Sequence, residues 1–292
     1  MCNNFLRGLL GLCLAAALGS CGGPTEAKPA LWLVEGPQGQ KAWLLGTIHA
    51  LQSPANWRSD TIEQALSQSD RLILEVADVG NDAATARTFA RLATDALPPP
   101  LARRIDQTLR DELAAELARD AIAPGSLDRY ETWAAALMIA QAQAYVGKQD
   151  SANGIDRALA KAYAGPIAEF EGAEAQLLIF DRLPQAQQHA LLASVIEDDP
   201  ATRNAKARRL ELAWATGNTA AIARLVDEDM FADPVLREVL LVGRNRDWVR
   251  KLLALLNNKA RPFVAVGAAH LAGADGLPAM LAARGYKVTR LQ

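Results

Sequence analysis

Two of the three histidines in this 292-residue chain end the same local pattern, an apolar run followed by Gly-x-x-His. The first copy is AWLLGTIH, residues 42–49, and the second is FVAVGAAH, residues 263–270. Ligands of open α/β sheets bind beyond the carboxyl ends of the strands, where this pattern places a histidine. If the two strands are neighbours, His49 and His270 converge, which suits two imidazoles on one metal ion. The alternative is that each histidine only ends its strand and hydrogen-bonds to backbone.

Two acidic residues are candidates for a third ligand or a general base. Glu75 ends the apolar run of residues 71–76, RLILEV, and a charge beside a buried strand needs a partner or a metal. Glu171 follows a further short predicted strand, residues 166–172. The simpler interpretations are that Glu75 is a surface residue at a strand end and that Glu171 is an acid in a solvated loop. The third histidine, His189, lies in a polar-faced helical stretch and is interpreted as a surface residue.

The N-terminus predicts a secretory leader and a lipid anchor. MCNNFLRGLLGLCLAAALGSC has one positive charge and then an apolar run too short to span a membrane as a helix. Its last four residues, LGSC, resemble the bacterial lipobox; the alternative is an ordinary signal peptide cut near Ser20. We therefore expect a signal peptide at 1–20, a tether at 21–30 and a lipid on Cys21. Gly22, at the position where an inner-membrane retention signal has Asp, favours the periplasmic face of the outer membrane.

Charge, cysteine count and absent motifs exclude several classes of protein. The net charge of −2 and the charged fraction of 22% include no dense basic run, so no nucleic-acid partner is expected. Cys2 and Cys13 leave with the signal peptide and Cys21 carries the lipid, so disulfides, cysteine-ligated zinc and cysteine nucleophiles are excluded on this interpretation. The sequence also contains no Gly-x-Ser-x-Gly elbow, Walker A loop, dinucleotide fingerprint or His-Glu-x-x-His motif.

The hydrophobic pattern predicts an α/β (α+β) fold in one domain, residues 31–292. A hairpin around Pro37-Gln38-Gly39 leads to the first Gly-x-x-His, a helix over 60–69 and the strand before Glu75. The C-terminal end repeats the order of strand, Gly-x-x-His, helix and strand. These halves are expected to form one central sheet, with a mostly helical insertion at about 81–260 between them.

Together these segments resemble the TraB/GumN/TIKI superfamily, in its bacterial GumN-like branch. The resemblance covers most of residues 31–292 in order, through AWLLGTIH, LILEVAD, GIDRALAKAYAGPIAEFEGAEAQ, LLVGRNRDW and FVAVGAAHLAGADGLPAMLAARGYKV. Two positions depart from the family pattern: Phe170 replaces a leucine, and Gly243 stands where an acidic residue is frequent.

The resemblance implies a metal-dependent hydrolase, since the animal TIKI members look like metal-dependent proteases that use these histidines and glutamates. Mn²⁺ or Co²⁺ is expected before Zn²⁺, with a peptide or small molecule as substrate. The implied site residues are the metal ligands His49 and His270, Glu75 as ligand or general base, Glu171 as a second acid, and Arg244 with Asn245 to orient substrate or an oxyanion. From charge pattern alone, the Arg244-Asn245-Arg246 cluster instead predicts a solvated face.

Two alternatives to this hydrolase remain open. One is a non-catalytic lipoprotein that binds a peptide, a haem-like ligand or an envelope polymer, because related folds serve in haem binding and pheromone shut-off. The other is a hydrolase that activates water with histidine and glutamate alone. Chelators would stop the metal enzyme and leave the latter active.

Overall fold

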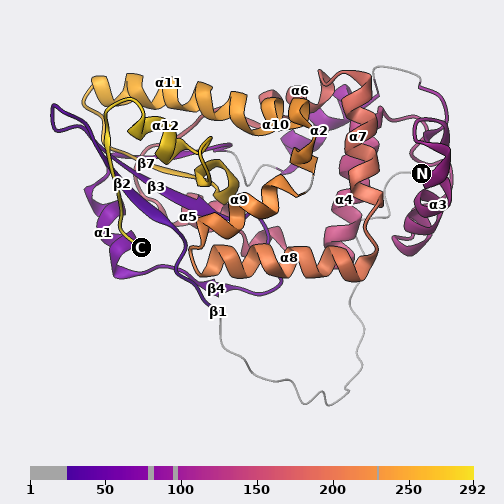
Figure 1. Cartoon of the computed structure of the whole chain (residues 1–292), viewed down its shortest axis with the longest axis horizontal. Coiled ribbons are helices and arrows are strands. Elements are labelled where there is room, and N and C mark those ends of the chain that lie inside the picture. The colour runs from indigo at the N-terminus through magenta and orange to yellow at the C-terminus, as the bar shows by residue number, and fades with distance from the viewer. Residues whose placement is uncertain (1–24, 78–81, 95–97, 229) are drawn as a thin grey trace, which may run out of the picture.

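A six-stranded sheet joins the two ends of the chain (Figure 1). The computed structural model describes residues 25–77, 82–94, 98–228 and 230–292. The strands of the sheet, in spatial order, are β6 (Ile167–Glu169), β5 (Arg71–Leu74), β7 (Pro262–Gly267), β3 (Lys41–Thr47), β2 (Leu31–Glu35) and β8 (Lys287–Arg290). Two short strands, β1 (Thr25–Glu26) and β4 (Ala55–Asn56), form a separate parallel pair.

The first and second Gly-x-x-His motifs end neighbouring strands. β3 and β7 are parallel, and their register pairs Gly46 with Val266 and Thr47 with Gly267. Both histidines therefore leave the same edge of the sheet. β2 and β3 form the predicted hairpin, and Gly39 in its turn has a φ of 81°, which glycine adopts without strain.

Helices fill most of the chain between β5 and β7, as predicted. They and the flanking helices are α1 (Asp60–Gln68), α2 (Asp82–Leu92), α3 (Arg110–Arg119), α4 (Thr132–Val146), α5 (Ile155–Ala162), α6 (Ala173–Asp181), α7 (Gln185–Ile196), α8 (Pro200–Ala215), α9 (Thr219–Asp227), α10 (Pro234–Arg237), α11 (Gly243–Asn257) and α12 (Leu277–Ala282). Single helical turns cover Leu101–Arg103, Gln107–Leu109, Ser151–Asn153, Met230–Ala232 and Ala268–Leu271, and a wider π-helical turn, Glu238–Val242, precedes α11.

Side chains alternate across the sheet and build a core on each face. On β3, Trp43 and Leu45 face one core, whose helices are α1, α5, α8 and α9, while Leu44 faces the other. The second core contains Trp248 of α11 and Leu277 of α12. Figure 1 shows α11 and α12 on the opposite side of the strands from α8. This half of the molecule is a three-layer sandwich, which confirms the predicted mixed fold.

The predicted insertion divides between two parts of the structure. Helices α2, α3, α4, α6, α7 and α10 surround a separate apolar core that includes Trp133. The other helices of the range pack on the sheet. His189 of α7 belongs to the helical part, where its ring is half-buried and its Nε2 atom is fully buried without a hydrogen-bond partner. His189 therefore lies at the margin of this core, partly exposed as predicted and with Nε2 turned inward.

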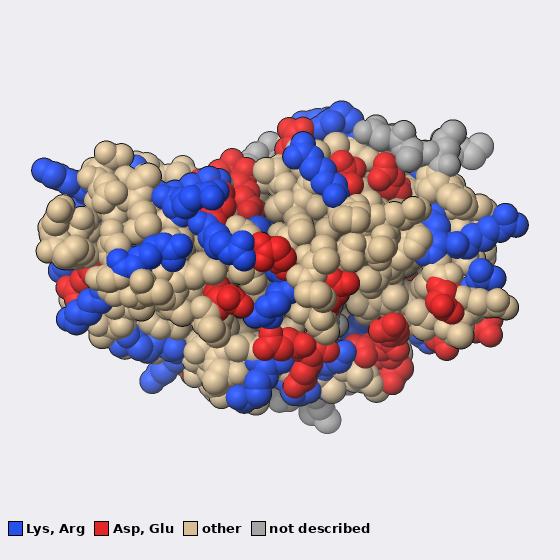
Figure 2. All heavy atoms as spheres, turned by 45° about the horizontal axis from the view of Figure 1, so that its top comes forward, with Lys and Arg blue, Asp and Glu red and all other residues tan. Residues whose placement is uncertain are grey.

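The predicted signal peptide and Cys21 lie outside the described residues. From Ala27 onward the chain packs against the fold: Ala27 and Ala30 are buried, and the amide of Lys28 donates to the Ala215 carbonyl at 2.6 Å. The described part of the predicted tether therefore belongs to the fold. Within the described ranges, no helix has both the length and the apolar character needed to cross a bilayer. Figure 2 shows basic and acidic side chains interspersed over the face that it views.

Candidate active site

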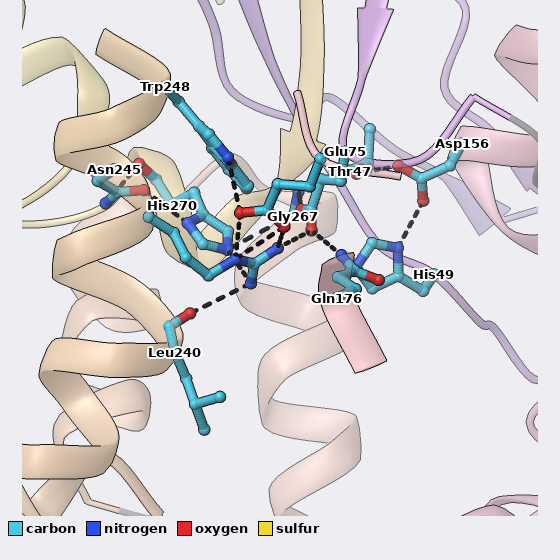
Figure 3. A network of polar contacts seen from close by, with 12 residues as sticks. Thr47, His49, Glu75, Asp156, Gln176, Leu240, Asn245, Trp248, Gly267 and His270 are labelled. Atoms are coloured by element: carbon cyan, nitrogen blue, oxygen red, sulfur yellow. Dashed lines mark hydrogen bonds and ion pairs between the residues drawn. The ribbon is translucent and has the colours of Figure 1, made fainter. Parts of the chain in front are cut away.

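The ends of β3 and β7 bring His49 and His270 around one point beside Gly267 (Figure 3). A Cβ atom on Gly267 would lie 3.3 Å from Nε2 of His49, 3.8 Å from Cδ2 of His270 and 3.2 Å from Oε1 of Glu75. The φ of Gly267 is −46°, which any residue adopts, so the glycine serves to keep this space open. Two imidazoles and a carboxylate thus share one small space.

Asp156, in the first turn of α5, orients His49. Its Oδ2 lies 2.8 Å from Nδ1 of His49, and its Oδ1 accepts a hydrogen bond from Thr47 at 2.7 Å. The His49 side chain is 64% exposed, with Nδ1 against Asp156 and Nε2 beside Gly267. Partial burial of the ring would lower the pKa of His49, but the charge and hydrogen bond of Asp156 outweigh it and raise the pKa to about 9.

Asn245 of α11 orients His270. Nδ2 of Asn245 donates to the Asp275 carbonyl at 2.7 Å, so its Oδ1, 2.6 Å from Nδ1 of His270, acts as acceptor. The proton of His270 is therefore placed on Nδ1, and Nε2 keeps its lone pair. The buried ring also contacts Trp248, with ring centroids 4.3 Å apart. Burial lowers the pKa of His270 to about 3, so the ring is neutral at pH 7.

Arg244 is the centre of the polar network, and its side chain is only 14% exposed. Its N–H groups contact both oxygens of Glu171, Oε2 of Glu75 at 2.8 Å, the Leu240 carbonyl at 3.2 Å and Nε2 of His270 at 3.3 Å. A guanidinium has five N–H donors, and these contacts use all of them. In this arrangement Arg244 has no donor left for a substrate oxyanion.

The charge pattern alone was wrong about this segment. Arg244 and Asn245 face inward, and the Asn245 side chain is fully buried. Only Arg246 lies outward, with its side chain 52% exposed and paired with Glu238. The π-helical turn before α11 requires Gly243, since a Cβ there would lie 2.8 Å from the Glu238 carbonyl oxygen. The glycine that departs from the family pattern is thus explained by local backbone packing.

The two glutamates have different neighbours. Glu75, directly after β5, accepts hydrogen bonds from the Gly267 amide at 2.8 Å and from Gln176 at 3.0 Å, in addition to Arg244. Burial alone would raise the pKa of Glu75, but nearby positive charge and the Gly267 amide lower it well below its usual range. That charge comes from His270, which is protonated in the acid range where Glu75 titrates, and from His49 and Arg244.

Glu171 faces Arg244 and the indole of Trp248, whose Nε1 donates to its Oε1 at 2.9 Å. The guanidinium of Arg244 lies 4.7 Å from the Trp248 ring centroid, so these three side chains pack as one unit. Glu171 therefore acts as the partner of Arg244 and Trp248.

A family model described as the TraB/PrgY/gumN family matches residues 30–290 of the chain. The chain belongs to the TraB/PrgY/gumN family. It is 30% identical over 253 residues to "Uncharacterized protein YbaP" of Shigella flexneri, which covers 84% of this chain and 89% of the relative. The protein of the same name from Escherichia coli (strain K12) is 30% identical over 246 residues, covering 82% and 86%. No solved structure matches the chain.

Several residues of the network were missed by the sequence reasoning as site residues: Thr47, Asp156, Gln176, Trp248 and Gly267. The available signal was position, since all of them lie inside the segments that carry the resemblance to the TraB/PrgY/gumN family. Asp156 and Gln176 belong to the segment GIDRALAKAYAGPIAEFEGAEAQ. Their chemistry could not be assigned, because each acts through a contact with a residue on another element.

The two imidazoles and the carboxylate around Gly267 of this TraB/PrgY/gumN member are donor types that bind divalent metals. In both histidines Nδ1 has a side-chain oxygen partner, which is the arrangement that directs Nε2 toward a metal. The missing Cβ of Gly267 leaves a cradle beside Nε2 of His49 and the Glu75 carboxylate. Within the described ranges, no three His, Cys, Asp or Glu side chains are already arranged as a ligand group. Arg244 contacts both Nε2 of His270 and Glu75, so a metal would compete with its guanidinium.

Proposed function

We propose that this protein is a metal-dependent hydrolase of the cell envelope that acts on a peptide or small-molecule substrate. The observation that supports it best is the space beside Gly267, which has Nε2 of His49, the His270 ring and Oε1 of Glu75 around it. Mn²⁺ or Co²⁺ is the expected ion, by the resemblance to the superfamily. When bound, such an ion supplies Lewis acidity toward a substrate oxygen and acidifies water.

His49, His270 and Glu75 are the residues that would hold the ion. Asp156 and Asn245 keep Nε2 of each imidazole directed toward the ion, which would displace the Nε2 proton that His49 carries at pH 7. Substrate enters from the side of His49, because its side chain is the exposed one in this cluster while His270 and Glu75 are buried.

Glu75 contributes negative charge rather than proton transfer. A general base works best when its pKa is near the operating pH, and the pKa of Glu75 is lowered far below neutrality. Arg244 and Glu171 act as positioning residues: Arg244 holds the Glu75 carboxylate, and Glu171 with Trp248 holds Arg244. Their role is to hold the negative charge of Glu75 beside the two histidines.

Metal binding and hydrolysis by histidine variants test the proposal. Purified protein loaded with Mn²⁺ or Co²⁺ is analysed for metal content, melting temperature and cleavage of a peptide library. His49→Ala and His270→Ala are expected to lose bound metal and activity. His189→Ala, the remaining histidine, serves as the control and is expected to keep both. Wild-type protein that binds no metal and shows no metal-dependent rise in melting temperature would contradict the proposal.

A second candidate is metal-free hydrolysis, and the contact of Asp156 with His49 favours it. A carboxylate on Nδ1 orients the imidazole of His49. Because the pKa of His49 is raised to about 9, its Nε2 takes a proton from water or a nucleophile only after the ring has lost its own proton, so this activity should rise with pH. This mechanism predicts activity that survives exhaustive chelation and depends on Asp156. Activity abolished by chelators and restored by Mn²⁺ or Co²⁺ would exclude it.

The cell-envelope location rests on Cys21, and we propose that this residue carries the lipid at the outer membrane. The supporting pattern is the leader that ends in LGSC. Mass spectrometry of the N-terminal peptide from the membrane fraction tests it. The expected result is a peptide that begins with a lipid-modified Cys21, whereas an unmodified peptide that begins near Gly22 would overturn it.

A further inference from the structure

The most exposed apolar side chains of the described residues are concentrated on two helices. Four of the six large hydrophobic side chains with high exposure lie at the end of α4 and on α8: Tyr145 at 81%, Val146 at 59%, Leu210 at 37% and Leu212 at 64%. Leu210 and Leu212 are two positions apart and project from opposite faces of α8, so only Leu212 can share a surface with Tyr145 and Val146. Exposed apolar side chains that lie together mark an interaction surface.

These two helices meet on the side of the molecule where the described chain begins. The turn after α4 contacts the segment before β4, because Gln52 donates to the Gly147 carbonyl at 3.0 Å. β4 pairs with β1, and the amide of Lys28 donates to Ala215 at the end of α8. Figure 1 shows β1, β4 and α8 along the same lower side.

The proposed lipid must lie close to this side. Cys21 precedes Thr25 by four residues. Even when fully extended, these four residues span at most about 14 Å. Helix α8, with 16 residues, is longer, at about 24 Å. A lipid on Cys21 therefore keeps β1, and the helices beside it, next to the bilayer.

The polar residues of this side suit a bilayer surface. Lys28, Lys148 and Arg208 are exposed on the segments of this side, Arg208 one helical turn before Leu212, and the acidic Asp150 is exposed as well. Lysine and arginine are attracted to anionic headgroups, and tyrosine is favoured at the level of the headgroups, where one end of its side chain is apolar and the other is wet. Glu26 lies on the same side and hydrogen-bonds to Asn56, so the attraction depends on apolar contact as well as charge.

We propose that the surface formed by Tyr145, Val146, Lys148, Arg208 and Leu212 lies against the lipid bilayer. The proposal rests on lipidation of Cys21 and makes the lipid anchor one of two membrane contacts. A single flexible tether would leave the domain free to rotate, whereas a second, apolar contact gives the domain one orientation on the membrane.

Site-specific fluorescence on the lipidated full chain tests this contact. After loss of Cys2 and Cys13 and modification of Cys21, the protein has no other cysteine, so one introduced cysteine takes a single environment-sensitive label. Val146→Cys and Leu212→Cys are the test positions. The matched control is Arg250→Cys on α11, whose side chain is 75% exposed. Each labelled protein is reconstituted into vesicles of phosphatidylethanolamine and phosphatidylglycerol.

The expected result is a blue-shifted emission and quenching by nitroxide lipids at positions 146 and 212, with neither effect at position 250. Emission at 146 and 212 that matches position 250, with full quenching by aqueous iodide, would overturn the proposal. A shift that follows protein concentration and not lipid content would assign the surface to a second copy of the chain, and would also overturn it. An unmodified Cys21 counts against it too. Metal binding, measured on the same samples, reports separately on the proposed hydrolase.

Discussion

The guanidinium of Arg244 lies 2.8 Å from Oε2 of Glu75, although 169 positions separate the two residues in the sequence. This contact joins α11 to the end of β5 and holds a carboxylate beside both site histidines. Glu171 completes the group from the end of β6. Two buried carboxylates thus share one guanidinium, and their surplus negative charge is available to a cation bound near His49 and His270.

Replacing Arg244 by methionine is expected to destabilise the fold strongly. It leaves Glu75 and Glu171 buried without their cation, and breaking a buried ion pair from one side costs about 3–5 kcal/mol. The free energy of unfolding in urea measures the effect. Arg246→Met, on the same helix with an exposed ion pair, should cost less than about 1 kcal/mol. Equal losses for the two variants would contradict the central role of Arg244.

Asp156→Asn should weaken metal binding with little change in fold. The amide cannot hold the His49 tautomer as the carboxylate does, and loss of such an outer partner typically costs 10–100-fold in metal affinity. Titration calorimetry with Mn²⁺ or Co²⁺ gives the value. Asp150→Asn, a nearby acid that caps Ser151–Asn153, is the control and should leave the affinity unchanged. An unchanged affinity in Asp156→Asn would remove His49 from the ligand set.

Gly267→Ala should lower activity by filling the space at the site, without straining the backbone. The new methyl group enters the space beside His49 and Glu75, and a displacement of this size can cost about 10²-fold in activity. Gly39→Ala in the hairpin turn is the reverse case: it has open space but a φ of 81°, so it should lower stability by about 1 kcal/mol and leave metal affinity intact. Melting temperature and metal affinity of both variants separate the two effects.

Asn245→Asp should raise the pKa of His270. Burial now keeps this ring neutral, and a carboxylate in place of the amide oxygen adds a negative charge beside Nδ1. The ¹⁵N chemical shifts of the ring, followed by NMR through a pH titration, report its protonation. Asn257→Asp, at the exposed end of the same helix, is the control. A His270 ring with an unchanged titration curve would show that Asn245 does not orient it.

Stability should fall in acid partly through Asp70, which joins the starts of β5 and β7. Burial would raise the pKa of Asp70, but Arg71 and the Arg261 amide, 2.9 and 2.8 Å away, lower it. A lowered pKa means that its contribution is present above the unfolded-state value of about 3.9 and is lost as pH falls through the folded-state value. Asp70→Asn should therefore cost about 1 kcal/mol at pH 7 and less at pH 3, in urea unfolding. A constant difference would show that the charge is not involved.

Local pattern was sufficient for the strands and for the motifs at their ends. An apolar run that stops at Gly-x-x-His fixes which residue follows the strand, and β3 and β7 end as the pattern predicted. The hairpin, the helix after Ser59 and the helix start at Asp233-Pro234 are also local, because caps and turns depend on a few neighbouring residues. Glu75 was found for the same reason, as a charge at the end of a buried strand.

Tertiary structure alone decided what those residues contact. The Arg244 segment has the composition of a solvated face, and only its packing behind His270 turns Arg244 and Asn245 inward. Asp156 reaches His49 across 107 positions of sequence, a distance at which no spacing rule applies. The periodicity of a sequence predicts which face of its helix or strand a side chain lies on. Which residue that side chain contacts depends on which other helices and strands the sheet order places beside it. For this reason the chain's own residues predicted the two histidines, and the fold supplied the network that orients them.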